Sequence, residues 1–240
     1  MELFSNEVIL IIIIFATSVI HGIAGFGFGL LSIPILTFFY DIKTAIIIAT
    51  YLTFISYTGP VVRNYKAMKI KGNFDIIIYI IIGMLFGIYI FKEFNEKYLS
   101  LITGGFIVLF GILLTVNFLP SLEKSESVKA FFGLISGALM TSCGMGGPPI
   151  VVYFSSLKLS ITQFRSNVLP IFFIMTSIAA IMYGFNDNQA KLTIFNSLKL
   201  LPSLIIGTEI GILVIRKINR KIFSLIVNLL IILSGIALFI

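Results

Sequence analysis

Long runs of hydrophobic residues recur along the whole chain and are separated by short polar stretches. Runs of this kind are long enough for helices to cross a hydrocarbon layer about 30 Å thick. Six of them are continuous: 44–62, 74–91, 98–119, 166–185, 200–215 and 222–240. Two more, at 8–39 and 130–157, are interrupted by glycine and proline. The pattern predicts an all-α polytopic integral membrane protein with almost no domain outside the membrane.

Composition agrees with this class and limits the partners. Hydrophobic residues make up 58% of the chain and charged residues 11%, with a mean hydropathy of +1.11. Soluble domains carry roughly twice that fraction of charge. The net charge of +7 lies in short loops, where Lys and Arg set topology and contact anionic membrane lipids. We therefore expect a multi-pass protein of the cell membrane that binds lipid but no nucleic acid, and no removed signal peptide.

The second half of the chain repeats the first. Residues 81–114 align without gaps on residues 205–238, at an offset of 124, with 15 of 34 positions identical. The identical positions include glycines and an Asn-x-Lys loop, which shared hydrophobicity alone does not explain. We therefore predict two homologous four-element halves, each made of one broken helix and three spans. They are an N-terminal repeat at 1–119, a linker at 120–129 and a C-terminal repeat at 130–240.

A glycine cluster occurs at the same place in each half. At an offset of 119, Gly25, Gly27 and Gly29 fall on Gly144, Gly146 and Pro148, with Gly147 between the last two. Paired glycine- and proline-interrupted segments indicate the binding site of a membrane transporter. A helix broken inside the membrane exposes N–H groups and a positive dipole end at the start of its second half, and both favour an anion. Close helix packing is the alternative role for these glycines.

Other glycine pairs have a different interpretation. Gly83 and Gly87, and their counterparts Gly207 and Gly211, are spaced by four residues, which favours close packing of helices. The sequence "GFGFG" superficially resembles a dinucleotide-binding loop, but it lacks the strand–turn–helix context of one.

The basic residues distinguish two topologies. If each interrupted segment crosses the membrane once, the 17 Lys and Arg residues divide eight to nine, and no orientation follows. If each dips in and returns, as a re-entrant hairpin, one face collects twelve of them. The twelve are Arg63, Lys66, Lys69, Lys71, Lys124, Lys129, Lys158, Arg165, Arg216, Lys217, Arg220 and Lys221. This arrangement makes the halves an inverted repeat and places both termini outside.

Two ionisable side chains are candidates for coupling transport to protons. His21, the one histidine, lies beside the first glycine cluster and titrates near physiological pH, although a neutral imidazole bonded to a freed carbonyl is the alternative. Glu209 lies inside a predicted span, where ionisable residues are functional candidates by default. It also lies seven residues before Arg216, so pairing near the membrane interface is the alternative.

Four polar residues near the second cluster are candidates for substrate binding. Arg165 could attract an anion with its planar donors, or it could only anchor the topology. Asn167 follows it at the start of the sixth span. Thr141 and Ser142 precede the cluster, and their hydroxyls could reach a ligand or bond their own helix carbonyls.

The sequence offers no cofactor, metal or redox centre. The single cysteine, Cys143, excludes an internal disulfide, and there is no cysteine–histidine cluster. Catalysis needs a convergent set of groups, and His21, Glu209 and Cys143 have no evident partners, so we expect no enzyme.

The two glycine clusters, "GFGFGLLSIP" and "GMGGPP", in a chain of eight segments, resemble the TauE/SafE family of sulfite and organosulfonate exporters. Phe26 and Phe28 interrupt the first cluster, where family members carry a denser run of glycines. The resemblance covers essentially the whole chain and implies a secondary transporter that exports a small sulfur-containing anion across a bacterial or archaeal plasma membrane. An accessory membrane subunit and, less favoured, an intramembrane enzyme are the alternative functions.

Overall fold

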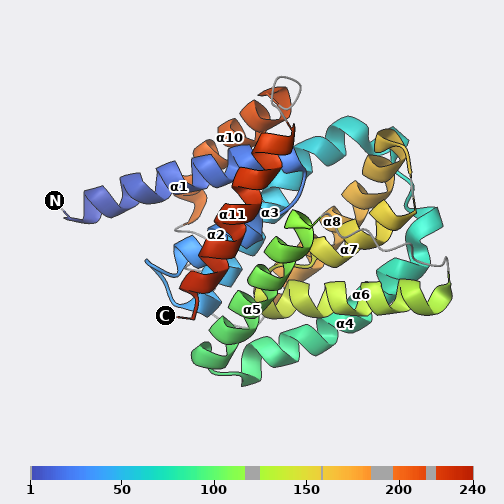
Figure 1. The fold of residues 1–240 in the computed structure, drawn as a ribbon, viewed down its shortest axis with the longest axis horizontal. Helices are drawn as coiled ribbons and strands as arrows, with labels where there is room; N and C mark the ends of the chain where they lie inside the picture. The colour runs from blue at the N-terminus through green and yellow to red at the C-terminus, as the bar shows by residue number, and fades with distance from the viewer. Residues whose placement is uncertain (1, 117–124, 158, 185–196, 215–219, 240) are drawn as a thin grey trace.

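The computed structural model describes residues 2–116, 125–157, 159–184, 197–214 and 220–239, and in these ranges it contains helices and turns but no strand. The elements of the first half are α1 (Glu2–Ala24), α2 (Phe28–Leu36), α3 (Ile42–Asn64), η1 (Tyr65–Ala67), η2 (Lys71–Asn73), α4 (Phe74–Glu93) and α5 (Glu96–Thr115). Those of the second half are α6 (Glu126–Cys143), α7 (Gly147–Ser156), α8 (Ile161–Gly184), η3 (Leu198–Leu200), α10 (Leu201–Val214) and α11 (Arg220–Ala237). Figure 1 labels the α-helices.

The helices fall on the predicted hydrophobic segments, and the two interrupted segments are each two helices. The segment 8–39 contains most of α1 and all of α2. The segment 130–157 contains most of α6 and all of α7. Residues 117–119, 185, 215 and 240 of the predicted spans and residues 120–124 of the linker lie outside the described residues. Five described helical stretches are long and apolar enough to span a membrane: Glu7–Ala24, Ile42–Ala67, Phe74–Glu93, Glu96–Thr115 and Thr162–Gly184.

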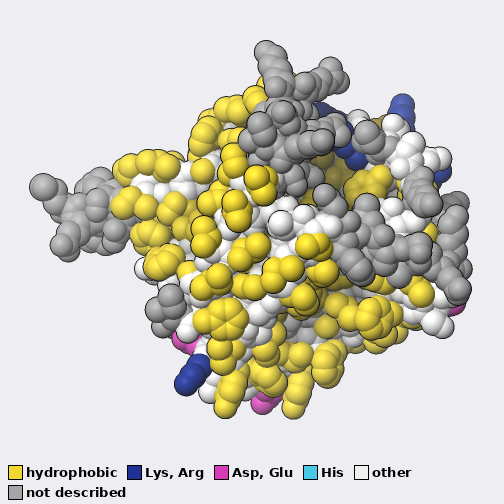
Figure 2. Space-filling view, in the orientation of Figure 1, with side chains coloured by type: hydrophobic (Ala, Val, Ile, Leu, Met, Phe, Trp, Pro, Cys, Tyr) yellow, Lys and Arg dark blue, Asp and Glu magenta, His cyan; other side chains and the backbone are white. Residues whose placement is uncertain are grey.

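The surface of the molecule is that of a protein in lipid. Large hydrophobic side chains such as Leu213, Phe86 and Leu233 lie exposed on the helices. Figure 2 shows hydrophobic side chains covering most of the visible face, with Lys, Arg, Asp and Glu near its edges. Exposed apolar area of this extent is unfavourable in water and favourable against lipid tails.

The same contact between helices occurs twice, once where α4 crosses α6 and once where α10 crosses α1. Gly83 of α4 lies against the backbone carbonyl of Leu134 in α6, and Gly207 of α10 lies against that of Phe15 in α1. Leu134 follows Phe15 by 119 positions, and Gly207 follows Gly83 by 124, which are the offsets of the sequence repeat. The pairs Gly87–Ala138 and Gly211–Val19 repeat this relationship one turn later. These glycines therefore serve close packing, as predicted for them.

The fourth elements of the two halves pack against each other symmetrically. Gly111 of α5 contacts Ile231 and Ile232 of α11, while Gly235 of α11 contacts Ile107 and Val108 of α5. Shifting one contact by 124 positions gives the other. Reciprocal contacts of this kind are those that a two-fold axis generates.

The directions of the helices can be read from the same contacts. Along α5, Gly104 lies against Gly235, and the later Gly111 lies against the earlier Ile231, so α5 and α11 are antiparallel. The helices α3 and α8 are also antiparallel, because the Tyr51 hydroxyl donates to the Ala180 carbonyl (2.5 Å) while Tyr57 packs on Phe172. The helices α1 and α10 run parallel, as do α4 and α6, since their contacts advance together.

Ion pairs at the outer ends of the parallel crossings follow the repeat as well. Glu7 pairs with Lys199 at 2.8 Å. This hydrogen bond raises the pKa of Lys199. The equivalent positions in the other crossing, Glu126 and Asp75, are both acidic, and Lys129 bridges them at 2.8 and 3.1 Å. Both crossings thus keep opposite charges together, although with different residues.

Candidate functional site

The first break lies between α1 and α2 and depends on glycine. Gly25 ends α1 with a φ of 79°, and its N–H donates to the His21 carbonyl at 2.7 Å. Gly27 precedes α2 with a φ of 86°. Side chains with a Cβ rarely adopt these backbone angles, so the chain can turn here because the residues are glycines. The helix α2 then begins at Phe28 without a side-chain cap.

The second break, between α6 and α7, is built in a similar way. Gly144 ends α6 with a φ of 70°, and its N–H donates to the Met140 carbonyl at 3.1 Å. The Ser136 hydroxyl donates to the Gly146 carbonyl and so fixes the chain inside the break. The helix α7 begins at Gly147 and continues with Pro148 and Pro149, residues suited to a first turn.

The two breaks meet and enclose a small pocket. A Cβ added at Gly29 would lie 2.7 Å from the Gly144 carbonyl oxygen, so the two backbones are in direct contact. The pocket beside them has a volume of about 30 Å³, which is room for a compact ion or a few water molecules. Its lining residues are Gly27, Phe28, Gly29, Leu30, Thr53, Tyr57, Met140, Gly144, Met145, Gly146, Gly147, Pro148, Phe172, Met175 and Thr176.

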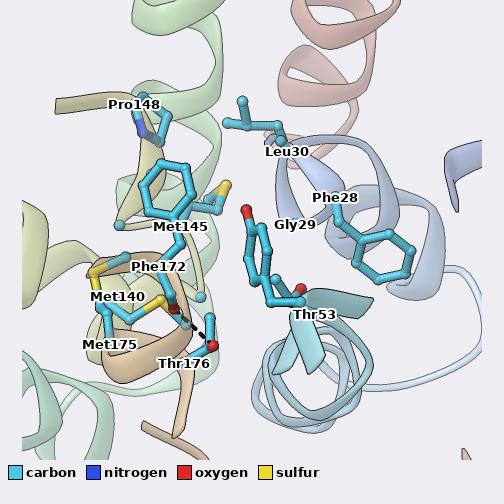
Figure 3. Close-up of a pocket in the computed structure, with 15 residues that line it drawn as sticks. Phe28, Gly29, Leu30, Thr53, Met140, Met145, Pro148, Phe172, Met175 and Thr176 are labelled. Atoms are coloured by element: carbon cyan, nitrogen blue, oxygen red, sulfur yellow. Dashed lines mark hydrogen bonds between the residues drawn. The ribbon is translucent and has the colours of Figure 1, made fainter. Parts of the chain in front are cut away.

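Figure 3 shows how the two halves contribute to this pocket. Residues of α2 and α3, among them Leu30 and Thr53, lie on one side. Residues of the second half, among them Met145, Pro148 and Phe172, lie on the other. The pocket is therefore formed only when the two halves pack together.

The two helix starts that face the pocket are chemically unequal. At the start of α2, Phe28, Gly29 and Leu30 each carry an N–H group that has no partner within the helix. At the start of α7, Gly147 carries one, but Pro148 and Pro149 have none. Most of the free backbone donors thus come from the first break, a difference that the matched glycine patterns do not reveal.

Three hydroxyl groups line the pocket. Thr53 donates to the Ala49 carbonyl at 2.6 Å, and Thr176 donates to the Phe172 carbonyl at 2.8 Å, so both hydrogens are used inside their own helices. The Tyr57 hydroxyl makes only a long contact, 3.4 Å, with the Gly25 carbonyl. Tyr57 is 5% exposed.

His21 lies directly behind the pocket wall. Its ring packs edge-on against Phe28 and Tyr57, with ring centroids 6.0 and 5.2 Å away. Its Nε2 lies 3.1 Å from the Ser56 hydroxyl, which itself donates to the Thr53 carbonyl. Which of the two groups donates depends on the tautomer of the ring. Nδ1 is buried and lies toward the backbone of Phe26, inside the first break.

Of the sequence-predicted binding residues, Pro148 and all the glycines except Gly25 line the pocket. Gly25 and the four polar residues are not among the lining residues. Thr141 donates to the Met84 carbonyl at 2.6 Å within the α4–α6 crossing. Ser142 donates to the Ala138 carbonyl at 2.7 Å, one turn earlier in its own helix. Ser142 thus bonds a carbonyl of its own helix, as in its alternative role, whereas Thr141 bonds a carbonyl of the neighbouring helix α4.

Arg165 and Asn167 lie at the start of α8, away from the lining residues. Arg165 is exposed. Asn167 accepts a hydrogen bond from the Asn73 side chain (2.9 Å), and the nearby Ser166 carbonyl accepts one from the Lys69 N–H (3.0 Å). These bonds attach the loop between α3 and α4 to the start of α8.

Glu209 has a partner that the sequence did not indicate. Its carboxylate pairs with Arg63 of α3 at 2.7 Å, and both side chains are about half exposed. Arg216, the partner considered from sequence, lies outside the described residues. Sequence reasoning also missed Tyr57, although a tyrosine inside an apolar span is a recognisable signal, because its hydroxyl needs a partner. In the described residues no group of three or more His, Cys, Asp or Glu side chains is arranged to hold a metal ion.

The apolar helices define a multi-pass helical membrane protein, and a small pocket lies between its two broken segments. A comparison with protein-family models matches residues 10–238 to the family described as Sulfite exporter TauE/SafE. Because the match covers nearly the whole chain, the protein belongs to the TauE/SafE sulfite exporter family. Searches of curated proteins and of solved structures give no match. Membership implies a membrane exporter of sulfite-like anions.

Proposed function

We propose that this protein is a secondary transporter that exports a small anion, such as sulfite or an organosulfonate, through the pocket between its two broken helices. One observation carries the proposal: the breaks occupy equivalent positions in the two halves and meet at Gly29 and Gly144, beside the pocket. A substrate held between two packed halves can be released to either side when the halves rock against each other.

The chemistry of the pocket suits an anion. The start of α2 directs free N–H groups and the positive end of a helix dipole at the site, and Gly147 adds one more N–H group. No acidic side chain is among the lining residues. Glycine at these positions lets a ligand approach the backbone closely, since no Cβ covers the N–H groups.

We further propose that the halves form an inverted repeat in which each broken segment re-enters the membrane. If each half crosses the membrane three times, equivalent helices of the two halves point in opposite directions. The contacts between α3 and α8, and between α5 and α11, are antiparallel, as this arrangement requires. Eight single crossings would make each of these pairs parallel. The hydrogen bond from Lys69 to Ser166 supports the same arrangement, because it joins the loop between α3 and α4 to the start of α8, which eight crossings would place on the opposite face.

His21 is our preferred candidate for proton coupling. It is buried, and its ring packs on the lining residues Phe28 and Tyr57. Ser56 connects it to the carbonyl of a third lining residue, Thr53. Protonation of its ring would add a charge directly behind the anion site. Glu209 is the second candidate, but its ion pair with Arg63 gives it a structural role as well.

Counterflow in proteoliposomes tests the function. The purified full-length chain is reconstituted alone, the vesicles are loaded with unlabelled sulfite, and entry of labelled sulfite is followed. We expect rapid exchange compared with protein-free vesicles. Absence of exchange in correctly inserted protein would point to an accessory subunit, and chemical conversion of the sulfite would point to an enzyme.

A further inference from the structure

Among the described residues, none that lines the pocket between the breaks is charged. The fifteen side chains and glycines that surround it include hydroxyl, thioether and aromatic groups, but no Lys, Arg, Asp, Glu or His. While His21 behind the wall is neutral, an anion in the pocket is therefore balanced by dipoles: the N–H groups at the start of α2, the single N–H of Gly147 and nearby hydroxyl groups.

Tyr57 is the side chain best placed to donate to a bound anion. It lines the pocket, it is 5% exposed, and its hydroxyl makes one hydrogen bond in the described structure, to the Gly25 carbonyl at 3.4 Å. Ordinary O–H···O hydrogen bonds are about 2.7 Å long, so the hydroxyl is poorly satisfied for a buried group. The hydroxyls of Thr53 and Thr176 already donate at 2.6 and 2.8 Å within their helices.

The remaining lining favours weakly hydrated ions. Met140, Met145 and Met175 present polarisable thioethers, and Phe172 presents its ring. None of these groups replaces the water that a strongly hydrated ion must lose. The Born cost of removing an ion from water grows with the square of its charge, so it is about fourfold larger for a dianion than for a monoanion of the same size.

We propose that this pocket accepts singly charged oxyanions, with the Tyr57 hydroxyl as their side-chain donor, and rejects doubly charged ones. The proposal rests on the proposed function, in which the pocket is the anion site. It assigns the transported form of sulfite to bisulfite, the monoanion, and it admits sulfonates, which stay singly charged near neutral pH.

Titration of the protein must be separated from titration of the ligand. The titratable side chains packed around the pocket are His21 on α1, Tyr57 itself on α3, Cys143 on α6 and Tyr183 on α8. The ion pair of Arg63 and Glu209 joins α3 to α10 farther along. Methanesulfonate is a monoanion throughout the accessible pH range, so its binding reports any change in the protein alone.

The experiment measures anion affinity by calorimetry on the purified full-length chain in detergent, at mildly acidic and mildly alkaline pH. We expect the affinity for sulfite to rise about tenfold more than that for methanesulfonate on going to the acidic pH, and sulfate to bind at least about tenfold more weakly than methanesulfonate at both. Sulfate binding as tight as that of methanesulfonate would overturn the charge selectivity while leaving the anion site intact. Absence of binding by all three anions would instead defeat the proposed function as well.

A matched pair of variants tests the tyrosine. Tyr57→Phe removes the hydroxyl from the pocket, and Tyr183→Phe removes one that donates to the Thr141 carbonyl (3.0 Å) outside the lining. We expect Tyr57→Phe to weaken methanesulfonate binding at least about fivefold with little change in melting temperature. Tyr183→Phe should lower the melting temperature and keep the affinity. Unchanged affinity in Tyr57→Phe would remove Tyr57 from the site.

Discussion

Gly29 lies against the backbone carbonyl of Gly144, so closely that a methyl group on Gly29 would lie 2.7 Å from that oxygen. The contact joins the two breaks, one from each half of the chain. Carbon and oxygen atoms that are not bonded stay more than 3 Å apart, so no side chain fits here unless one break moves. The positions of the two helix starts beside the pocket are therefore fixed by backbone packing.

The neighbouring glycines of the second break should respond differently to the same substitution. A methyl group at Gly147 would lie 3.6 Å from the Phe172 ring, an ordinary contact, and would enter the pocket. A methyl group at Gly146 would lie 2.6 Å from the Ser136 carbonyl oxygen. We expect Gly147→Ala to keep its melting temperature and to lose about tenfold in anion affinity, or about 1.4 kcal/mol. We expect Gly146→Ala to lose stability by about 1–3 kcal/mol.

A third position completes this test. Gly27 has a φ of 86°, and a Cβ there would make only an ordinary contact, 3.6 Å to Leu30 Cδ1, so Gly27→Ala strains the backbone by about 1–2 kcal/mol without a steric clash. Calorimetric binding and thermal unfolding of all three variants in detergent would separate the effects. Normal affinity in both Gly27→Ala and Gly147→Ala would reduce the breaks to packing features.

The paired crossings should behave as one motif that occurs twice. Gly83→Ala and Gly207→Ala each place a methyl group against a backbone carbonyl of the facing helix. We expect both to destabilise the protein by about 1–3 kcal/mol and to lower the yield of folded protein. Gly105→Ala is the matched control, because its methyl group meets only the Phe239 ring, at 4.0 Å. It should leave the melting temperature unchanged or raise it slightly, since Ala is the better helix former.

The membrane helices and the breaks could be predicted because each has a local cause. Span length follows from the hydrophobic run, and the breaks follow from glycines such as Gly25 and Gly144, whose positive φ angles exclude other residues. The repeat also predicted which glycines serve packing, because Gly83 and Gly207 occupy equivalent positions without a neighbouring proline.

The side-chain content of the site could not be predicted in the same way. Tyr57 and Phe172 lie in spans that look like ordinary apolar helices, and they reach the pocket only because α3 crosses α8 beside the breaks. The pair of Arg63 and Glu209 is equally non-local, since the two residues are 146 positions apart. Thr141 was expected near the ligand from its position in the sequence, but the rotation of α6 directs it at α4.

Single cysteines should report the topology. In a Cys143→Ser background, cysteines at Asn64, Thr162 and Glu96 are all at exposed positions near helix ends. The re-entrant arrangement, oriented by the basic residues, predicts that Asn64→Cys and Thr162→Cys resist an impermeant thiol reagent added outside cells, whereas Glu96→Cys reacts. Eight single crossings would put positions 64 and 162 on opposite faces, so labelling of one but not the other would contradict the inverted repeat.

Proton coupling should depend on His21 rather than on Glu209. His21→Gln removes the imidazole from behind the pocket, so we expect pH-driven transport to be lost while counterflow continues, because exchange requires no net proton movement. Ser56→Ala removes the hydroxyl that shares a hydrogen bond with Nε2 and keeps the imidazole, so it should retain coupling with a shifted pH profile. The double variant Arg63→Gln/Glu209→Gln removes an exposed ion pair worth at most about 1 kcal/mol and should keep both activities. The measurement is uptake into proteoliposomes with and without an imposed pH gradient, and loss of the gradient effect only in the double variant would move the coupling site to Glu209.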